Sequence, residues 1–179
     1  MSCVSEPPPY SGSVCWGEYD GTLRTAILAM KHGAHDELAP PLAKRLAARV
    51  SVERWVDDLD LVTAVPSHPL HRLQRGFTAA ELLAHGVSAA LNLPCRATLR
   101  RHGLGRQMGQ SRTQRLNLGP NRFSLRRKAQ IEKRRILLVD DVSTTGSTMS
   151  RAAQTLLSGG ATEVFGAILA LAPETRRLA

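Results

Sequence analysis

Residues 136–153, ILLVDDVSTTGSTMSRAA, constrain the fold more than any other part of the sequence. An apolar run over 135–139 is typical of a strand in a parallel sheet that helices cover on both faces. Two carboxylates follow at the carboxyl end of this strand, and a turn of small residues then begins a helix over about 147–157. The segment therefore predicts an α/β unit with a polar turn at the end of a buried strand.

The chemistry of this turn suits a sugar phosphate. Backbone N–H groups at the positive end of a helix favour an anion, and Gly146 permits close backbone approach. Asp140 and Asp141 precede the turn as acceptors for a vicinal diol. A phosphate site beside a diol site describes a ribose 5-phosphate. The residues expected to bind the phosphate are Thr144, Thr145, Gly146, Ser147 and Thr148.

Other nucleotide motifs fit the segment less well. It is not a P-loop, because no Lys follows Gly146 and the carboxylates come before the turn. The dinucleotide fingerprint G-x-G-x-x-G is absent. Two readings stay open: the paired acids could bind Mg²⁺ alone, or the turn could be a structural cap. The cap is the weaker reading, because two adjacent carboxylates would repel each other there without a ligand.

The rest of the chain alternates helical and strand patterns. Helices are expected from residue 22 to before Gly33, over 38–50 and over 78–92, and strands over 59–65 and 162–171. This alternation predicts a parallel sheet with right-handed crossovers. Residues 1–18 contain three consecutive prolines and little apolar periodicity, so an irregular arm is expected there. Residues 19–179 are expected to form a single domain.

Positive charge is concentrated in one part of the sequence. Residues 96–135 contain 13 basic residues against one acidic residue, while the whole chain has a net charge of +9. Residues 96–130 are expected to form a basic loop or hood insertion, with strands near 96–100 and 121–125. A basic block of this kind points to an anionic partner, either a polyphosphate or a nucleic acid, although a solvated basic surface is the plain alternative.

Composition excludes several classes of protein. Three cysteines, Cys3, Cys15 and Cys95, lie far apart, which disfavours a disulfide framework and a zinc site. No apolar run approaches the roughly 20 residues of a membrane span. The first residues resemble no secretory signal, so a cytoplasmic protein is expected.

Three segments of the sequence resemble motifs of a known family. VDDVSTTGST is similar to the motif with which type I phosphoribosyltransferases bind phosphoribosyl pyrophosphate (PRPP). Residues 19–33, YDGTLRTAILAMKHG, and 65–84, VPSHPLHRLQRGFTAAELLA, resemble the ComF and GntX group. The resemblance implies an α/β, type I phosphoribosyltransferase-like parallel sheet flanked by helices, with a small hood and a flexible loop. It also implies that Asp140 and Asp141 bind the ribose 2′- and 3′-hydroxyls and that the turn binds the 5′-phosphate.

Further roles follow from the same resemblance. The loop after the strand over 59–65 corresponds to the pyrophosphate loop, with Arg72 as a further cationic contact. Mg²⁺ is the implied cofactor, and it would reach Asp140 and Asp141 through its complex with PRPP. Arg106 and Gln107, in a Gly-rich basic stretch, are the candidate catalytic residues of a closing loop. The residues expected to bind pyrophosphate are Ser67, His68, Arg75 and Lys31.

Two positions bear on the acceptor: one departs from the pattern of the ComF and GntX group, and the other differs from purine 6-oxo transferases. The family's RGFNQ is RGFTA here, with Thr78 and Ala79 as the replacements. Thr144 stands where purine 6-oxo transferases carry an acidic acid/base residue, which disfavours a hypoxanthine or guanine acceptor. These departures leave the acceptor open.

The predicted function is transfer of ribose 5-phosphate from PRPP to an unidentified nitrogenous acceptor. The alternatives are a competence or DNA-uptake accessory protein, in which the basic segment contacts single-stranded DNA, and a nucleotide sensor that binds PRPP without turnover. Expected partners are PRPP, the acceptor and either single-stranded DNA or a competence protein. A homodimer is also a candidate assembly.

Overall fold

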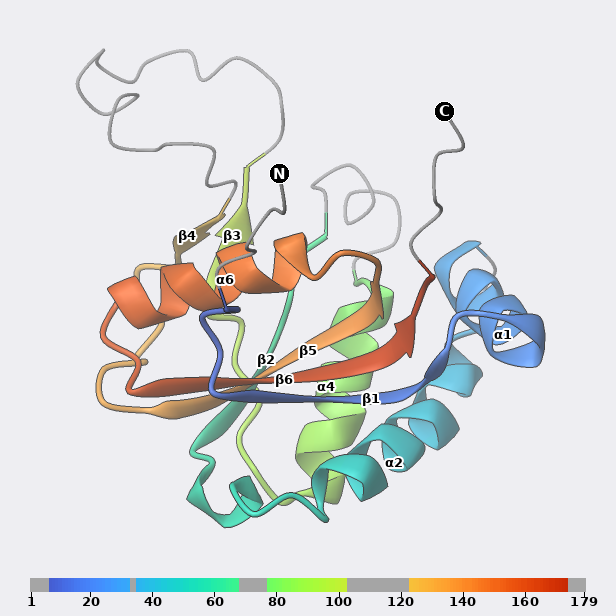
Figure 1. The fold of residues 1–179 in the computed structure, drawn as a ribbon, viewed down its shortest axis with the longest axis horizontal. Coiled ribbons are helices and arrows are strands. Elements are labelled where there is room, and N and C mark those ends of the chain that lie inside the picture. Colours follow the sequence, from blue (N-terminus) through green and yellow to red (C-terminus); the bar gives the residue numbers. More distant parts are fainter. Residues whose placement is uncertain (1–6, 33–34, 68–76, 103–122, 174–179) are drawn as a thin grey trace.

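The computed structural model describes residues 7–32, 35–67, 77–102 and 123–173 (Figure 1). Four strands form a parallel sheet in the order β1-β6-β5-β2, and two short strands, β3 and β4, pair antiparallel in a second sheet. The elements are β1 (Gly12–Glu18), α1 (Gly21–His32), η1 (Asp36–Leu38), α2 (Ala39–Val50), η2 (Val56–Asp58), β2 (Leu61–Ala64), α4 (Ala79–Ala90), β3 (Leu99–Arg101), β4 (Phe123–Leu125), β5 (Arg135–Ser143), α6 (Ser147–Ser158) and β6 (Glu163–Leu171). The predicted parallel sheet flanked by helices is confirmed.

The first strand corrects one prediction. An irregular arm was expected over residues 1–18, but Gly12–Glu18 form β1, which pairs parallel with β6. Only Val14 of this strand is fully buried, so β1 lacks the apolar run that identifies the other strands. Its place in the sheet depends on hydrogen bonds to a strand far along the chain.

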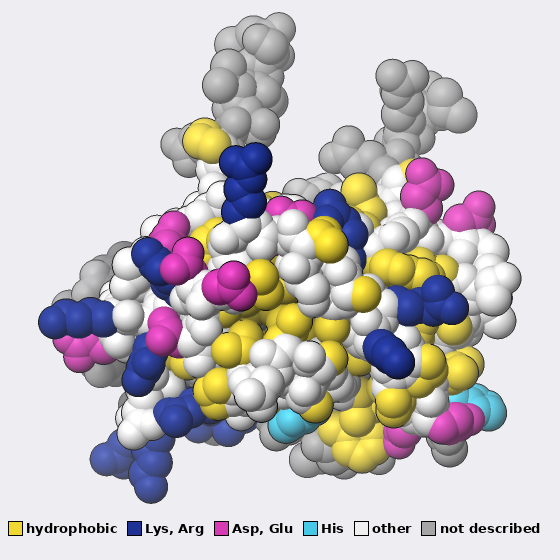
Figure 2. Space-filling model, turned by 90° about the horizontal axis from the view of Figure 1, so that it is seen from below, with side chains coloured by type: hydrophobic (Ala, Val, Ile, Leu, Met, Phe, Trp, Pro, Cys, Tyr) yellow, Lys and Arg dark blue, Asp and Glu magenta, His cyan; other side chains and the backbone are white. Residues whose placement is uncertain are grey.

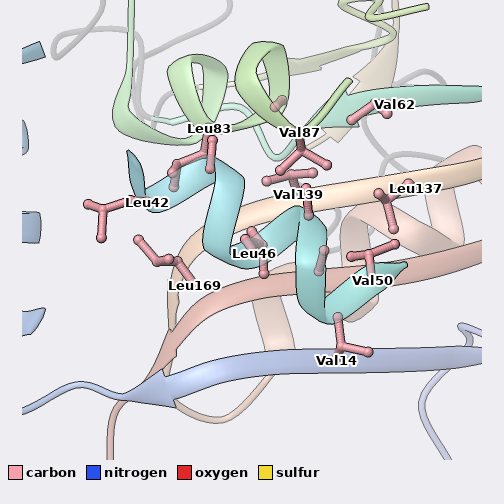
Figure 3. Packing of buried hydrophobic residues seen from close by; sticks show 14 of the residues in the cluster. Val14, Leu42, Leu46, Val50, Val62, Leu83, Val87, Leu137, Val139 and Leu169 are labelled. Atoms are coloured by element: carbon pink, nitrogen blue, oxygen red, sulfur yellow. The ribbon is translucent and has the colours of Figure 1, made fainter. Parts of the chain in front are cut away.

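Alternation along β5 builds a core on each face of the sheet. Leu137 and Val139 pack against α2 and α4, where Leu46 and Leu83 are fully buried (Figure 3). Ile136 and Leu138 belong to the second core, beneath α6. Because both faces are covered, the strand is apolar at successive positions, as the sequence predicted.

The segment after α4 extends the sheet and carries the hood. The N–H of Val62 in β2 donates to the carbonyl of Pro94, and the N–H of Arg96 donates to the carbonyl of Val62. The hydroxyls of Thr63 and Thr98 hydrogen-bond at 2.8 Å in a buried position. This attachment leads directly into β3, so the described parts of the predicted 96–130 insertion are fixed to the edge of the sheet.

Within the described ranges, no helix combines the length and the apolar character that a bilayer span requires.

Candidate functional site

The predicted phosphate-binding residues lie together between β5 and the start of α6. Gly146 is the N-cap residue of α6 and has φ of 71°, a left-handed conformation that favours glycine. Gly146 has no side chain to cap the helix, and its carbonyl accepts a hydrogen bond from Ser150 N–H. Oγ1 of Thr145 accepts a hydrogen bond from Ser147 N–H at 3.4 Å. Thr144 and Thr145 are exposed beside it. The turn thus presents hydroxyls and helix-terminal N–H groups to solvent, where an anion can reach them.

One residue beside the turn was not predicted. A Cβ at position 146 would lie 3.7 Å from the hydroxyl oxygen of Tyr10, so this phenol lies against the turn. Tyr10 also packs against the core beneath α6. No local pattern indicates this contact, because Tyr10 falls in the 1–18 segment, for which an irregular arm is predicted.

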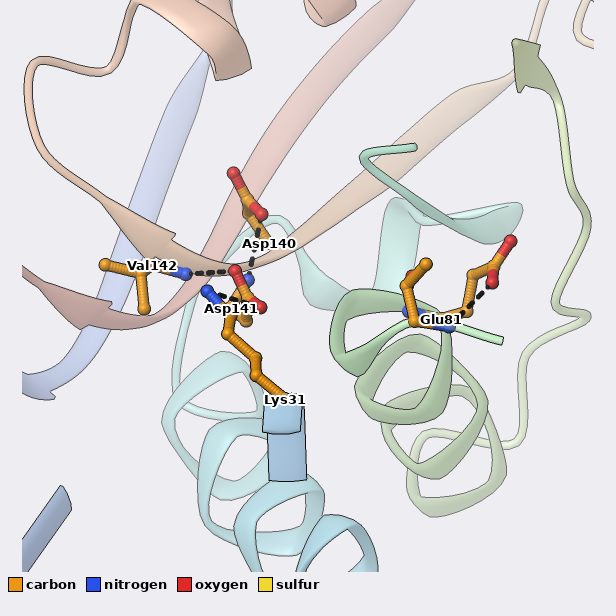
Figure 4. Close-up of polar contacts among 6 residues, drawn as sticks. Lys31, Glu81, Asp140, Asp141 and Val142 are labelled. Atoms are coloured by element: carbon orange, nitrogen blue, oxygen red, sulfur yellow. Dashed lines mark hydrogen bonds and ion pairs between the residues drawn. The ribbon is translucent and has the colours of Figure 1, made fainter. Parts of the chain in front are cut away.

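Asp140 and Asp141 occupy the last part of β5 and are both 8% exposed. As consecutive residues of a strand, they leave it on opposite faces. Asp140 follows Ile136 and Leu138 on the α6 face, while Asp141 is directed toward α1 on the other face (Figure 4). The two predicted diol-binding acids are therefore adjacent but not equivalent.

Lys31 of α1 is the cation at this pair. Its Nζ lies 3.0 Å from Oδ2 of Asp141 (Figure 4). Burial, and next the negative charge of Asp141, raise the pKa of Asp140 well above its usual value. The hydrogen bond that Asp141 N–H donates to Asp140 and the charge of Lys31 act in the opposite direction. The structure thus brings together two buried acids and one lysine.

The end of β2 lies beside these acids. Ala64 is in register with Val139, and Val65 N–H donates to the carbonyl of Val139 at 2.8 Å. Ser67 follows this strand end and is partly exposed. His68, Arg72 and Arg75 lie outside the described residues, as do Arg106 and Gln107. Of the predicted pyrophosphate loop, the structure therefore describes only its first residues.

Thr78, one of the departures from the family pattern, has a structural role. It is the N-cap of α4: its hydroxyl accepts a hydrogen bond from Glu81 N–H, and its own N–H donates to the Glu81 carboxylate. This capping box typically stabilises a helix by about 0.5–2 kcal/mol. The T-x-x-E spacing was visible in the sequence and is the signal that sequence reasoning did not use.

A pocket of about 310 Å³ lies beside α4 and the end of β2. Its walls are mostly apolar, and burial raises the pKa of the Cys95 thiol that lines it. A thiol with a raised pKa is a poor nucleophile at neutral pH. The lining residues are Ala64, Pro66, Phe77, Glu81, Leu82, Ala84, His85, Cys95, Arg96, Ala97 and Leu99.

The acids are suited to Mg²⁺ only together with a ligand. Among the described residues, no group of three His, Cys, Asp or Glu side chains could hold a metal ion by itself. Asp140 and Asp141 supply hard carboxylate oxygens, the donor type that Mg²⁺ prefers. Mg²⁺ commonly binds through one or two carboxylates plus substrate phosphates. The donor set therefore fits an ion that arrives with a phosphorylated ligand.

Comparisons with known proteins agree with this geometry. The sequence profile of the family described as "Phosphoribosyl transferase domain" matches residues 73–178. The chain is 32% identical over 173 residues to the DNA utilization protein YhgH of Escherichia coli K12, covering 90% of this chain and 73% of that protein. It is 29% identical over 175 residues to Competence protein F of Haemophilus influenzae, covering 91% and 74%.

Solved structures show the same fold. The glutamine PRPP amidotransferase from B. subtilis superposes with a TM-score of 0.56 at 23% identity, over 79% of this chain and 30% of that one. A structure described as the allosteric regulatory enzyme of purine biosynthesis gives a TM-score of 0.52 at 26% identity, over 73% and 25%. With the family match and the YhgH and Competence protein F relatives, these similarities show that the chain belongs to the ComF-type family of phosphoribosyltransferase-like proteins.

Proposed function

We propose that this protein binds Mg²⁺·PRPP and transfers ribose 5-phosphate to a nitrogenous acceptor, with release of pyrophosphate. The observation that carries the proposal is the arrangement at the end of β5. There, two buried carboxylates directly precede a left-handed glycine turn at the start of a helix. This arrangement can serve a diol and a phosphate of one sugar at the same time.

In this proposal each group of residues serves one part of PRPP. The 144–148 turn binds the 5′-phosphate, and Asp140 and Asp141 serve the ribose hydroxyls. Ser67, His68 and Arg75 bind pyrophosphate, which is supported by the position of Ser67 after β2, the neighbour of β5. Lys31 was predicted as a further pyrophosphate contact, and its role is argued separately below.

The reaction exchanges one bond at ribose C1. The lone pair of the acceptor nitrogen forms the new C1–N bond, while the C1–O bond to pyrophosphate breaks and its electron pair leaves with the pyrophosphate. The protein must offset the charge of the leaving group and exclude water. Arg75 serves the first task, and Arg106 and Gln107 of the closing loop serve the second. Mg²⁺, when bound, supplies further charge neutralisation at the phosphate oxygens.

Binding can be tested by thermal unfolding. A ligand that binds only the folded chain stabilises it by about 2.7 kcal/mol at 100 times its Kd. Mg²⁺·PRPP should therefore raise Tm by several degrees, and the Asp140→Ala/Asp141→Ala double variant should lose this shift. An unchanged shift in the folded double variant would refute the assignment of the site.

Turnover requires a separate measurement. PRPP consumption with Mg²⁺ is measured against a panel of nucleobases, amines and cell extract. Consumption that depends on one acceptor and on Asp140 supports a transferase. Tight binding without consumption on any acceptor would instead identify a PRPP sensor.

A second candidate function, contact with single-stranded DNA, is favoured by the surface of the hood. Arg100, Arg127 and Lys128 are exposed, and in the described parts of the chain none of them forms an ion pair. Figure 2 shows basic side chains across this face of the molecule, several of them beside acidic ones, and a separate basic group at the lower left. Two relatives are named for DNA utilization and for competence.

The DNA proposal predicts a definite salt dependence. Each phosphate contact to a single strand contributes about −0.7 to the slope of log K against log salt concentration. Replacing Arg100, Arg127 and Lys128 by Gln should make the slope shallower by about 2 and weaken binding for all sequences alike. A slope that is unchanged in the triple variant would exclude this surface.

A further inference from the structure

Both carboxylate oxygens of Asp141 are already engaged by the protein. Its Oδ1 accepts a hydrogen bond from Val142 N–H at 2.7 Å, and its Oδ2 lies 3.0 Å from Lys31 Nζ. The Asp141 side chain is 12% exposed and the Lys31 side chain 33%. This ion pair is therefore largely shielded from water, unlike the exposed pairs that contribute little.

Asp140 differs from Asp141 in the partners of one carboxylate oxygen. Its Oδ1 accepts a hydrogen bond from Asp141 N–H at 2.9 Å. Within the described residues, its Oδ2 receives no hydrogen bond from a backbone N–H and no ion pair from a basic side chain. Asp140 thus offers an open oxygen on the α6 face, the face on which the phosphate turn continues into its helix.

The charges explain why a lysine is needed at this place. Two adjacent carboxylates in a buried position repel each other, and burial penalises both charges. Lys31 approaches from α1 and offsets the charge of Asp141. If its Nζ moved to a pyrophosphate, Asp141 would remain as a buried, uncompensated charge beside Asp140, a situation that is strongly unfavourable.

We propose that Lys31 is a positioning residue of the ribose site: it holds Asp141 and offsets its charge, and it does not bind pyrophosphate. The inference rests on the proposed function, because it takes the two acids as the ribose-binding pair. The two possible roles of Lys31 predict different effects of its loss on the affinity for different ligands. A pyrophosphate contact matters for PRPP alone, whereas a positioning residue of the acids matters for every ligand that carries the ribose.

Calorimetric titration with Mg²⁺·PRPP and with ribose 5-phosphate plus Mg²⁺ distinguishes these roles. Lys31→Met should weaken binding of both ligands by the same factor, about 10-fold to 100-fold, the usual cost of losing a residue that orients a ligand-binding group. Lys31→Arg, which retains the cation, should restore most of the affinity for both. Lys44→Met, which removes an exposed lysine of α2, is the matched control and should bind both ligands like the wild type.

Three outcomes would overturn the inference. Loss of PRPP affinity with normal binding of ribose 5-phosphate would make Lys31 a pyrophosphate ligand. Normal affinity for both ligands with a lowered Tm would leave Lys31 a purely structural tie between α1 and β5. Failure of the wild type to bind either ligand would overturn the proposed function itself, and this inference with it.

Discussion

At the scale of single residues, Asp140 shows the conflict between binding and stability. Its carboxylate is buried beside a second acid, and both conditions oppose ionisation. Among the described residues, the backbone N–H of Asp141 and the charge of Lys31 favour the charged form. A residue selected for stability alone would be neutral here, so an acid at this position fits the ribose-binding role proposed for it.

Asp140→Asn should therefore stabilise the protein at neutral pH. Because the pKa of Asp140 is raised in the folded chain, the folded state holds this proton after the unfolded state has lost it. The free energy of unfolding consequently falls as pH rises from the usual carboxyl range toward the raised pKa. Asparagine removes this loss, and its Oδ1 can still accept from Asp141 N–H.

Thermal unfolding between pH 4 and 8 measures this effect. A gain of about 1 kcal/mol corresponds to an increase in Tm of about 2–4 °C for a chain of this length. The advantage of the variant should shrink as pH falls toward about 4, because the carboxyl then becomes protonated in the unfolded state as well. Asp57→Asn, at an exposed position, serves as control. A lower Tm for Asp140→Asn at neutral pH would contradict the expectation.

At the scale of elements, α2 and α4 approach each other so closely that one contact position has no room for a side chain. A Cβ at Gly86 of α4 would overlap the Cβ of Ala43 of α2. Glycine inside a helix costs about 0.5–1 kcal/mol relative to alanine. The close contact of the two helices is thus obtained at the expense of helix propensity, and it lets Leu46, Leu83 and their neighbours fill the core above β5.

Gly86→Ala tests this packing. The substitution improves helix propensity, yet overpacking a close contact costs about 1–3 kcal/mol, so a net decrease in Tm is expected. Adding Ala43→Gly to the variant removes the overlapping methyl group and should recover part of the loss. Higher stability of Gly86→Ala alone would show that the two helices separate without cost.

At the scale of the whole molecule, β1 is an edge strand of the sheet, and its pairing covers the edge of β6. A chain that starts at Tyr19 would leave the edge of β6 unpaired, and exposed strand edges pair with other chains. Such a truncation should lower Tm and produce dimers or larger aggregates in light scattering. Removing only residues 1–6 retains β1, and this control should show the same Tm and the same light scattering as the full chain. A fully stable, monodisperse truncation at Tyr19 would show that β1 is dispensable.

Sequence reasoning succeeded where the signal was local. The 135–139 run, the acidic pair and the glycine turn predicted β5 and the start of α6, because apolar periodicity and turn chemistry act over a few residues. It placed the end of β5 too early, since Asp140 and Val142 continue the pairing with β6 despite their polar neighbours.

The misses share one physical cause. β1 is a strand because β6 pairs with it, and Lys31 meets Asp141 because the fold brings the end of α1 to the last part of β5. Tyr10 reaches Gly146 in the same way. Each of these contacts joins positions far apart in the sequence, so no window of neighbouring residues contains both partners.

The pairing of β1 with β6 also sets the order in which the chain can fold. Val14 is in register with Ala167, so the loop that this contact closes spans about 150 residues. Closing so long a loop costs entropy before the contact returns any energy, and folds rich in such contacts form slowly. On the ribosome the first strand emerges long before its partner has been synthesised. Until β6 has been synthesised, β1 therefore lacks its native partner and can form non-native strand pairs.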